Sequence, residues 1–378
     1  MSGRRMRVLH VGKFYPPHRG GMESHLETLA RELSADVDVE VLVSSSGRRT
    51  IRETLDGIPV TRIGKVGSFA AASLNPGMAR AIRDAEADVV HFHHPNPTGV
   101  LSYLASGRRG PLVVTYHSDI IRQRALGAAF APVLHRFLRR AHAILASSPD
   151  YAATSPVLRR HASRVRIVPF GIRAEAFETA DAGAVAAIRA RHGPRLVVGA
   201  GRLVYYKGFD YLVRAMAAVD ARLVLLGDGP LRGALQALAH EAGVADRVHL
   251  AGSVADFAPW YHAADVFALP AVARSEAFGL VQLEAMAAGT PVVNTRLDSG
   301  VPFVSRDGET GITVPPADVD ALAAALNRLL GDAPLRRRLG EAGRERVRRE
   351  FSLDRMVAQT LAVYQQAMSL DVSRTPSR

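Results

Sequence analysis

The chain has 378 residues, of which 48% are hydrophobic and 22% are charged, and this is enough apolar material for two domains with cores of their own. Such a composition excludes an intrinsically disordered chain, a filament and a lone small module. The sequence contains no cysteine, so disulfides, thiolate metal sites and cysteine nucleophiles are excluded as well.

Positive charge is concentrated in the first half of the chain. Residues 1–171 hold 24 Lys or Arg against 13 Asp or Glu (net +11), whereas residues 172–378 hold 24 against 23 (net +1). No uncharged apolar run approaches the roughly 18–20 residues that span a bilayer, and the first residues lack the apolar core of a signal peptide. We therefore expect a cytoplasmic protein, peripheral at the inner face of the membrane if its basic half meets an anionic surface.

Short apolar runs alternate with longer amphipathic stretches. In the first half we predict strands at 7–12, 37–44, 89–92, 112–116, 144–146 and 165–168, and helices at 23–33 and 78–85. In the second half we predict strands at 196–200, 223–227, 248–251, 266–269 and 291–294, and final helices at 318–330, 333–349 and 353–368. Strands that are apolar on both faces belong to parallel sheets covered by helices. The sequence therefore predicts an α/β chain with two doubly wound, Rossmann-like domains.

The break in charge and pattern sets the predicted boundaries. We expect an N-terminal domain at 1–171 on the acceptor side, a C-terminal domain at 172–352, and a helix at 353–370 that packs back on the N-terminal domain before a frayed tail at 371–378. Because open parallel sheets bind ligands beyond the carboxyl ends of their strands, candidate site residues are sought in the loops at those ends.

Two glycine-bearing loops are candidate anion sites. Gly20 and Gly21 precede a helix, where backbone amides can approach an anion closely, although a plain turn has the same sequence. The loop after the first strand of the second domain carries Arg202 and Lys207, which suit one multiply charged phosphate group unless both are merely solvated. The first loop does not match the G-x-G-x-x-G spacing, and Gly227-Asp-Gly229 lacks the third glycine of that pattern, which disfavours a nicotinamide or flavin enzyme.

Histidines form a further candidate group. His91 and His93 share one face of a strand, a spacing that suits a metal, but no cysteine or nearby carboxylate completes a ligand set. We therefore expect them to line the site without a metal. His117 lies in Thr115-Tyr-His-Ser-Asp119 at the end of another strand, where the alternative is a purely structural histidine.

The segment 275–293 contains the most specific pattern. Glu276 lies in a loop after a strand, Gly279 begins a helix with free amide donors, and Glu284 lies further along that helix. Carboxylates so placed can accept hydrogen bonds from sugar and ribose hydroxyls, while the amides bind a phosphate oxygen. Two isolated glutamates at this spacing would otherwise be solvated surface residues.

Glu276 and Glu284, with seven residues between them and Ala-Gly-Thr-Pro-Val-Val after them, resemble the E-x7-E signature of the retaining glycosyltransferases of family 4. The resemblance covers roughly residues 6–368 and continues in Gly20-Gly21-Met-Glu23, Gly201-Arg-Leu203, Lys207-Gly208, Leu226-Gly-Asp-Gly-Pro230, Ala264-Asp-Val-Phe-Ala-Leu-Pro270 and Asp307-Gly-Glu-Thr-Gly311. It implies the GT-B fold, in which two Rossmann-like domains face a central cleft.

The resemblance also implies a role for each candidate residue. Arg202 and Lys207 would neutralise the donor diphosphate, and Glu276 would hold the transferred sugar. Glu284 would bind the ribose diol. The remaining donor contacts would come from the amides of Gly20, Gly21, Gly279, Leu280 and Val281, from Val254 packing on the base and from Asp256 pairing with a guanine. His117 would contact the sugar near its anomeric carbon, with Asp119 orienting it. No metal or other cofactor is expected.

The predicted activity is transfer of a hexose, with retention, from a nucleoside-diphosphate sugar to a glycan or lipid-linked acceptor in surface polysaccharide or glycolipid assembly. GDP-mannose is favoured because the surroundings of Lys207 and of the Glu276–Glu284 segment resemble those of mannosyl- and rhamnosyltransferases. The enzymatic alternatives are a UDP-sugar transferase and an epimerase or phosphorylase of the same fold. The non-enzymatic alternatives are a glycan-binding protein without catalysis and a basic nucleic-acid-binding protein. A nucleic-acid partner is not expected, because no binding motif accompanies the positive charge.

The stretch 126–141 mixes apolar residues with arginines. It predicts either a helix that lies in a membrane interface or a helix that faces the core with a basic outer side. The oligomeric state is left open.

Overall fold

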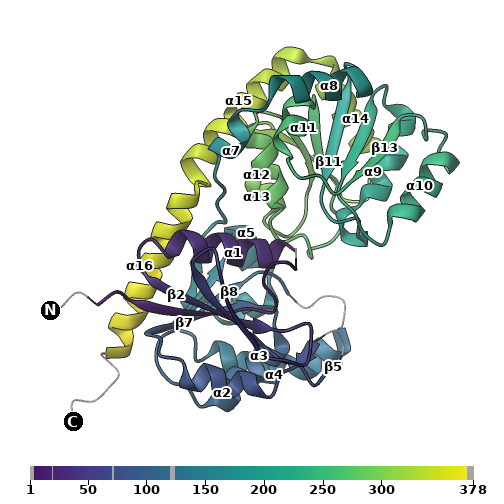
Figure 1. The fold of residues 1–378 in the computed structure, drawn as a ribbon. Helices are drawn as coiled ribbons and strands as arrows, with labels where there is room; N and C mark the ends of the chain where they lie inside the picture. The colour runs from purple at the N-terminus through teal and green to yellow at the C-terminus, as the bar shows by residue number, and fades with distance from the viewer. Residues whose placement is uncertain (1–3, 19, 70–71, 120–123, 373–378) are drawn as a thin grey trace, which may run out of the picture. The chain divides into compact units, whose positions relative to one another are not determined.

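The computed structural model describes residues 4–18, 20–69, 72–119 and 124–372, and the chain divides into two compact units (Figure 1). Unit 1 comprises Met1–Ser147, Ala152–Val168 and Met356–Arg378, and unit 2 comprises Ser148–Tyr151 and Pro169–Arg355. The chain thus changes unit after Val168, where the sequence analysis placed the boundary after 171, and it returns to unit 1 at Met356, where that analysis placed the last segment from 353.

Unit 1 is built on a sheet with the strand order β10-β9-β8-β7-β1-β2-β4-β3. Its strands are β1 (Arg7–Val11), β2 (Asp38–Ser44), β3 (Ile51–Leu55), β4 (Ile58–Ile63), β7 (Val89–His94), β8 (Leu112–Tyr116), β9 (Ala143–Ala146) and β10 (Val165–Ile167). All neighbours in the sheet pair in parallel except β3, which is antiparallel to β4. A separate antiparallel pair is formed by β5 (Gly67–Phe69) and β6 (Ala72–Leu74).

The sequence analysis predicted parallel sheets and did not predict the antiparallel edge strand β3. β3 is largely exposed and carries charged side chains, as edge strands commonly do, so it lacks the apolar run that predicts a buried parallel strand.

The helices of unit 1 pack on both faces of this sheet. They are α1 (Gly21–Leu33), α2 (Gly77–Asp84), α3 (Pro97–Ser106), α4 (Arg124–Leu138), α6 (Pro156–Arg160), the 3-10 turn η1 (Ala162–Arg164) and most of α16 (Leu353–Val372), while α5 (Pro149–Thr154) begins in unit 2. α16 continues through Asp371 and Val372, so the predicted frayed tail begins too early; residues 373–378 lie outside the described residues.

The apolar side of α4 belongs to the core of unit 1. Leu134, Phe137 and Leu138 are buried, and the ring of Phe137 contacts Phe92 at 4.8 Å and Tyr103 at 5.4 Å between centroids. Of the two interpretations of the 126–141 stretch, the core-facing helix is correct, because these side chains are unavailable to a bilayer. Among the described residues no helix is long and apolar enough to cross a membrane.

Unit 2 contains a parallel sheet with the strand order β13-β12-β11-β14-β15-β16. Its strands are β11 (Leu196–Ala200), β12 (Arg222–Leu226), β13 (Val248–Gly252), β14 (Val266–Leu269), β15 (Val292–Thr295) and β16 (Gly311–Val314). Its helices are α7 (Glu175–Glu178), α8 (Ala182–His192), η2 (Tyr205–Lys207), α9 (Phe209–Ala215), η3 (Met216–Ala218), α10 (Arg232–Glu241), α11 (Ala258–Ala263), α12 (Leu280–Ala287), α13 (Val301–Val304), α14 (Val319–Gly331) and α15 (Ala333–Glu350). β16 escaped the sequence analysis because it is short and only partly apolar.

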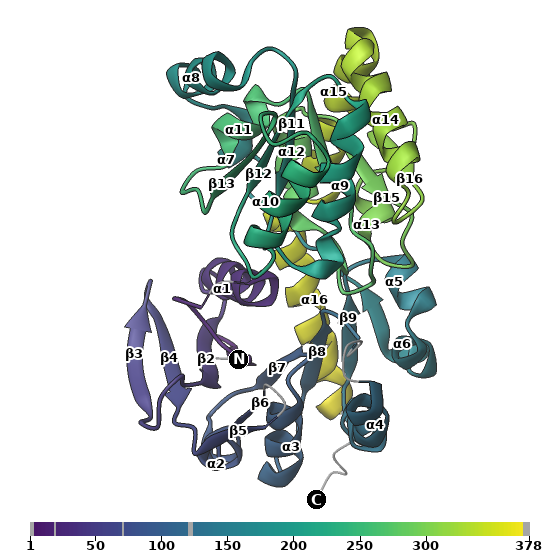
Figure 2. The same cartoon turned by 90° about the vertical axis from the view of Figure 1, so that its right-hand side faces the viewer.

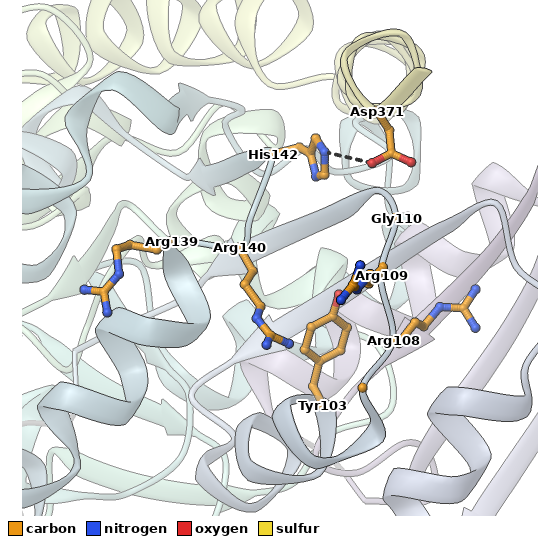
Figure 3. Close-up of a pocket in the computed structure, with 9 residues that line it drawn as sticks. Tyr103, Arg108, Arg109, Gly110, Arg139, Arg140, His142 and Asp371 are labelled. Atoms are coloured by element: carbon orange, nitrogen blue, oxygen red, sulfur yellow. Dashed lines mark ion pairs between the residues drawn. The ribbon is translucent and has the colours of Figure 1, made fainter. Parts of the chain in front are cut away.

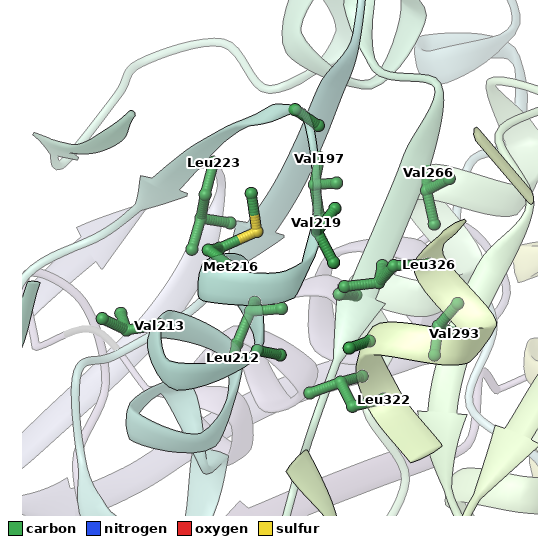
Figure 4. Packing of buried hydrophobic residues seen from close by; sticks show 14 of the residues in the cluster. Val197, Leu212, Val213, Met216, Val219, Leu223, Val266, Val293, Leu322 and Leu326 are labelled. Carbon is green, nitrogen blue, oxygen red and sulfur yellow. The ribbon is translucent and has the colours of Figure 1, made fainter. Parts of the chain in front are cut away.

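Helices cover both faces of the unit 2 sheet (Figure 2). On one face, Leu212 and Met216 pack with Leu326 of α14 against Val197 and Val293 of the sheet (Figure 4). Burying a side chain of this size contributes about 1.5–3 kcal/mol relative to leaving it exposed. This core makes the sheet a rigid platform for the loops at the carboxyl ends of its strands.

Candidate functional site

An ion pair between Lys207 and Glu276 forms the centre of the candidate site in unit 2. Lys207 ends the turn η2 after β11, and Glu276 lies in the loop after β14. Lys207 Nζ lies 2.7 Å from Glu276 Oε2, and each side chain is only 10% exposed. β11 and β14 are neighbours at the point where the strand order of the sheet reverses. This is the place where open α/β sheets bind ligands.

Two glycines allow Lys207 to fold back over the end of β11. Gly201 has φ +134°, and a Cβ there would lie 3.1 Å from Lys207 Nζ. Gly208 has φ +66°, and a Cβ there would lie 2.0 Å from the carbonyl oxygen of Pro270. Both positions therefore require glycine.

Arg202 lies on the same loop and is exposed. Within the described part of the chain, its guanidinium has neither an ion-pair nor a hydrogen-bond partner. The structure therefore offers one cation already paired with a carboxylate and a second that is open to an anionic ligand.

The start of α12 supplies backbone donors beside this pair. Gly279 precedes the helix with φ +77°, and a Cβ there would lie 2.7 Å from Leu269 Cδ2. The amides of Leu280 and Val281 lie in the first turn, where N–H groups have no partner within a helix and the helix dipole is positive. An anionic oxygen is the natural acceptor for such groups.

A buried polar network that the sequence analysis missed fixes α12 in place. The Gln282 side-chain amide donates to the Phe278 carbonyl at 3.2 Å and accepts from Asn294 Nδ2 at 2.9 Å. Thr313 Oγ1 in turn donates to Asn294 Oδ1 at 2.7 Å. The available signal was a lone Gln and a lone Asn inside apolar runs.

Glu284 lies on α12 and bonds to a residue that the sequence analysis did not name. The Tyr261 hydroxyl donates to Glu284 Oε2 at 2.7 Å. Burial raises the pKa of Glu284 to about 7, against the lowering effects of this hydrogen bond and of the Lys207 charge. The carboxyl group therefore exchanges its proton near neutral pH.

The two residues proposed to contact the base follow β13. Val254 is partly buried, whereas Asp256 is exposed and its Oδ1 accepts a hydrogen bond from the Ala258 amide at 3.0 Å. Asp256 thus has a structural role at the start of α11. A role for either residue in recognising a base remains a prediction.

Gly20 precedes α1 in unit 1, and Gly21 is the first residue of that helix. Gly20 has an extended backbone that any residue adopts, with φ −174°. A Cβ at Gly21 would meet no atom within 4 Å. Packing within the described residues thus does not explain Gly21, which leaves the close approach of a ligand as a reason for glycine there.

Five buried histidines gather on one face of the sheet, at the carboxyl ends of β1, β7 and β8. His10 lies opposite His91 in the register of β1 and β7, His93 lies two residues further along β7, and His117 follows β8. His25 of α1 packs edge-on to His117, with 5.1 Å between centroids. Burial lowers the pKa of all five, to about 3 for His10 and His25. His10 and His25 were not predicted from the sequence.

Hydrogen bonds tie these rings together. His93 Nε2 lies 3.1 Å from His10 Nδ1, and His93 Nδ1 lies 3.1 Å from His117 Nε2. Asp119, which was predicted to orient His117, accepts hydrogen bonds from the hydroxyls of Tyr116 and Ser155. An action of Asp119 on His117 stays a prediction.

Two groups in this cluster have the ring spacing of a metal site, with ligand atoms within 4.8 Å of one another: His10, His91 and His93, and His25, His93 and His117. In the first group both ring nitrogens of His91 are engaged, with Tyr364 Oη at 2.5 Å and Thr115 Oγ1 at 2.7 Å. In the second group a metal would have to replace the hydrogen bond between His93 and His117. These contacts favour hydrogen-bonded rings over metal ligands.

A basic cavity of about 370 Å³ lies elsewhere in unit 1, near the amino ends of β8 and β9 (Figure 3). We call it the arginine pocket, and its lining includes Tyr103, Arg108, Arg109, Arg139, Arg140, His142 and Asp371. Arg108 donates to the carbonyls of Ile82, Ala85 and Ala87 and so has a structural role.

The other three arginines of the pocket are exposed. Arg109, Arg139 and Arg140 have no ion-pair or hydrogen-bond partner within the described residues. Arg140 extends toward Tyr103, whereas Arg139 points away from it (Figure 3). The pocket therefore has the charge to receive an anion.

Comparison with known proteins identifies the family. Residues 20–171 match the family described as "Glycosyl transferase 4-like domain", and residues 185–346 match the family described as "Glycosyl transferases group 1". D-rhamnosyltransferase WbpZ from Pseudomonas aeruginosa is 32% identical over 353 residues, which are 92% of each chain. GDP-mannose-dependent alpha-(1-6)-phosphatidylinositol monomannoside mannosyltransferase from Mycolicibacterium smegmatis is 32% identical over 367 residues, 89% of this chain and 92% of the relative.

Solved glycosyltransferase structures share the fold. The solved structure of sucrose-phosphate synthase from Thermosynechococcus elongatus matches with a TM-score of 0.82 and 25% identity, covering 97% of this chain and 100% of that one. The structure has two Rossmann-like units, and Lys207 pairs with Glu276 at the β11/β14 switch point. Together with these similarities, this shows that the chain belongs to the group 1 glycosyltransferases, with the GT-B fold.

Proposed function

We propose that this glycosyltransferase moves a mannose-type hexose from a GDP-sugar to a glycan or lipid-linked acceptor, with retention of anomeric configuration, in surface polysaccharide or glycolipid assembly. The observation that carries the proposal is the ion pair of Lys207 and Glu276, with Arg202 on the same loop and the amides of α12 beside it.

The pair fits the charge changes of the reaction. The bond between the anomeric carbon and the diphosphate oxygen breaks, a bond to the acceptor oxygen forms on the same face, and the acceptor proton passes to the leaving diphosphate. Negative charge grows on the diphosphate, where Lys207 and Arg202 stabilise it. Glu276 accepts hydrogen bonds from hydroxyls of the sugar. Because their charged atoms are 2.7 Å apart, one pair serves both parts of the donor.

The remaining roles are assigned by position. Glu284 binds the ribose diol, Val254 and Asp256 the base, and the amides of Gly279, Leu280 and Val281 the diphosphate. In unit 1, the amides of Gly20 and Gly21 also serve the diphosphate, and His117 serves the transferred sugar. In this proposal no metal takes part, because two side-chain cations and the positive end of a helix supply the charge that a metal gives other transferases.

GDP is favoured as the nucleotide because a relative at 32% identity is named as GDP-mannose-dependent. The test is the thermal shift of the full chain with GDP, UDP and TDP, followed by the sugars of whichever nucleotide stabilises it most. GDP should give the largest shift, and GDP-mannose should be turned over. A larger shift with UDP would establish the UDP-sugar alternative instead, and no shift with any nucleotide would contradict the whole assignment.

Retention is tested separately. The product made from an α-linked donor should carry an α-linkage, which the one-bond coupling at its anomeric carbon reports by NMR. A β-linked product would show inversion and exclude same-face attack.

The arginine pocket supports a second part of the proposal, that unit 1 meets an anionic membrane surface on the cytoplasmic side. Arg109 and Arg140 are exposed cations at a cavity, and guanidinium groups pair well with phosphate. Vesicles of phosphatidylcholine with phosphatidylglycerol should carry the protein in flotation, and the Arg109→Gln/Arg140→Gln variant should float less.

The matched control for flotation is Arg214→Gln/Arg337→Gln, which removes two exposed arginines from unit 2. Equal flotation of the two double variants would mean that net charge, and not the pocket, governs binding. Flotation on phosphatidylcholine alone would contradict an electrostatic contact.

A further inference from the structure

We propose that His93, backed by His10, is a positioning residue that holds His117 in the tautomer with its proton on Nδ1. The inference deepens the proposed function and rests on it only for the role of His117 toward the sugar.

The three rings form a hydrogen-bonded row that crosses three neighbouring strands. His10 comes from β1, His93 from β7, and His117 follows β8, and these strands are adjacent in the sheet. The two ring-to-ring distances are both 3.1 Å, between His10 Nδ1 and His93 Nε2 and between His93 Nδ1 and His117 Nε2. His93 therefore uses both of its ring nitrogens for hydrogen bonds within this row.

The ring of His91 does not compete for these bonds. His91 stacks on His93 at 4.6 Å between centroids, but its nitrogens bond Tyr364 and Thr115. His10 and His93 are fully buried, and His117 is 8% exposed. Burial favours the uncharged form of each ring, and the lowered pKa values agree. A neutral imidazole has one donor and one acceptor nitrogen. Hydrogen bonds in the row are therefore donated either from His117 toward His10 or from His10 toward His117.

The His10 end of the row decides between these two directions. His10 Nε2 is buried and has no hydrogen-bond partner among the described residues. If His117 donated to His93 and His93 to His10, His10 Nε2 would carry a buried proton without an acceptor. In the other direction His10 Nδ1 donates to His93, and His93 Nδ1 donates to His117 Nε2. His10 Nε2 is then an unused acceptor, and no buried ring proton of His10 lacks an acceptor.

The favoured direction fixes the proton of His117. Its Nε2 accepts from His93, so the proton of the neutral ring resides on Nδ1. Toward whatever lies at Nδ1, His117 is then a hydrogen-bond donor. In the proposed reaction this suits a hydroxyl oxygen of the sugar as acceptor.

The direct test is the tautomer of His117 in the unliganded full-length protein. Long-range proton–nitrogen correlation spectra of the chain labelled with ¹⁵N-histidine distinguish a protonated from an unprotonated ring nitrogen. The assigned His117 signals should show Nδ1 protonated and Nε2 unprotonated. A proton on Nε2 would overturn the proposal without any variant.

Variants then test whether His93 sets that state. The amide nitrogen of Asn takes the place of His Nδ1, so His93→Asn should keep the His117 tautomer, whereas His93→Leu should lose it. Without the hydrogen bond we expect about a tenfold fall in kcat in His93→Leu and an unchanged donor KM. His93→Asn should restore most of kcat. No change of tautomer in His93→Leu would contradict the proposal.

The matched control is His94→Leu. His94 is fully buried and lies next to His93 in the chain, but its ring stacks on Tyr116 and neither ring nitrogen has a partner among the described residues. It should leave the His117 tautomer and the donor KM unchanged. The same tautomer change in His94→Leu would reduce the effect to general disturbance of the strand end. Because the tautomer is measured without substrate, a protein that binds no nucleotide would refute the proposed function and leave this assignment standing.

Discussion

Lys207 and Glu276 are bound to each other, with 2.7 Å between Nζ and Oε2, although the proposed reaction assigns them to different parts of the donor. With each side chain 10% exposed, each charge depends on the other to offset its loss of water. The pair also holds both side chains in place before a ligand binds, which is what electrostatic stabilisation of a transition state requires. Substitutions at this pair should therefore affect the stability of the fold and the turnover of the enzyme to different extents.

Replacing Lys207 alone tests that separation. Lys207→Met leaves the Glu276 carboxylate without its cation, so the free energy of unfolding should fall by about 3 kcal/mol, and turnover should fall at least about 100-fold. The Lys207→Met/Glu276→Gln double variant should recover most of the stability and none of the turnover. Urea denaturation and initial rates measure the two effects. If the double variant is no more stable than the single one, the ion pair does not stabilise the fold.

Arg202 should affect activity alone. It is exposed and has no partner within the described residues, so Arg202→Ala should leave the melting temperature unchanged while turnover falls about 100-fold. Arg214→Ala removes an exposed arginine from the nearby helix α9 and should alter neither property. Normal turnover in Arg202→Ala would remove this residue from the diphosphate site.

The sequence was informative about unit 2 because its site is built from strand ends. The apolar runs of β11 and β14 and the glycines after them are local patterns, so Arg202, Lys207, Glu276 and Gly279 could be named. The bond between Lys207 and Glu276 depends on which strands are neighbours, and it was not predicted. Tyr261 was missed because its link to Glu284 joins two helices through side chains alone.

Unit 1 shows the opposite case. His10 and His25 are single histidines in otherwise ordinary amphipathic or apolar stretches, and nothing local distinguishes them. They join His93 and His117 only because β1 lies beside β7 and α1 covers that end of the sheet. The exposed edge strand β3 was missed for the reverse reason, since it carries little apolar signal at all.

Glu284 should link nucleotide binding to proton release. Its pKa is about 7 in the free protein, and a ribose diol favours the ionised carboxylate that accepts both hydroxyls. Binding of GDP near pH 7 should therefore release a fraction of a proton. Calorimetric titrations in buffers of different ionisation enthalpy measure it, and Glu284→Gln should abolish it.

Tyr261→Phe provides the matched change at the same site. It removes a hydrogen bond that lowers the pKa of Glu284, so that pKa should rise and more protons should be released at pH 7. Proton uptake on binding, or release that persists in Glu284→Gln, would exclude this carboxyl group as the ribose ligand.

The buried histidines should make the protein sensitive to acid. The folded-state pKa is about 3 for His10, His25 and His94, against 6.5 as the ordinary value. Between these values the unfolded chain binds more protons, so stability is full above about pH 6.5 and falls as the pH decreases below it. Each such histidine contributes about 1.4 kcal/mol per pH unit. Denaturation at pH 7, 6 and 5 should show a shallower decline in His94→Leu, with the difference approaching that amount between pH 6 and 5. An unchanged slope would mean that the pKa of His94 is not lowered by folding.

Gly21 and Gly279 should respond differently to alanine. At Gly279, with φ +77° and Leu269 Cδ2 2.7 Å from the position of a Cβ, Gly279→Ala should lower stability by about 1–2 kcal/mol and disturb the start of α12. At Gly21 a Cβ meets nothing within 4 Å, so Gly21→Ala should leave stability unchanged or slightly higher. If the Gly21 amide approaches the donor diphosphate, the added methyl group should still weaken donor binding and turnover. Measuring melting temperature and donor KM together makes the comparison decisive, because normal kinetics in Gly21→Ala would mean that no ligand approaches this residue closely.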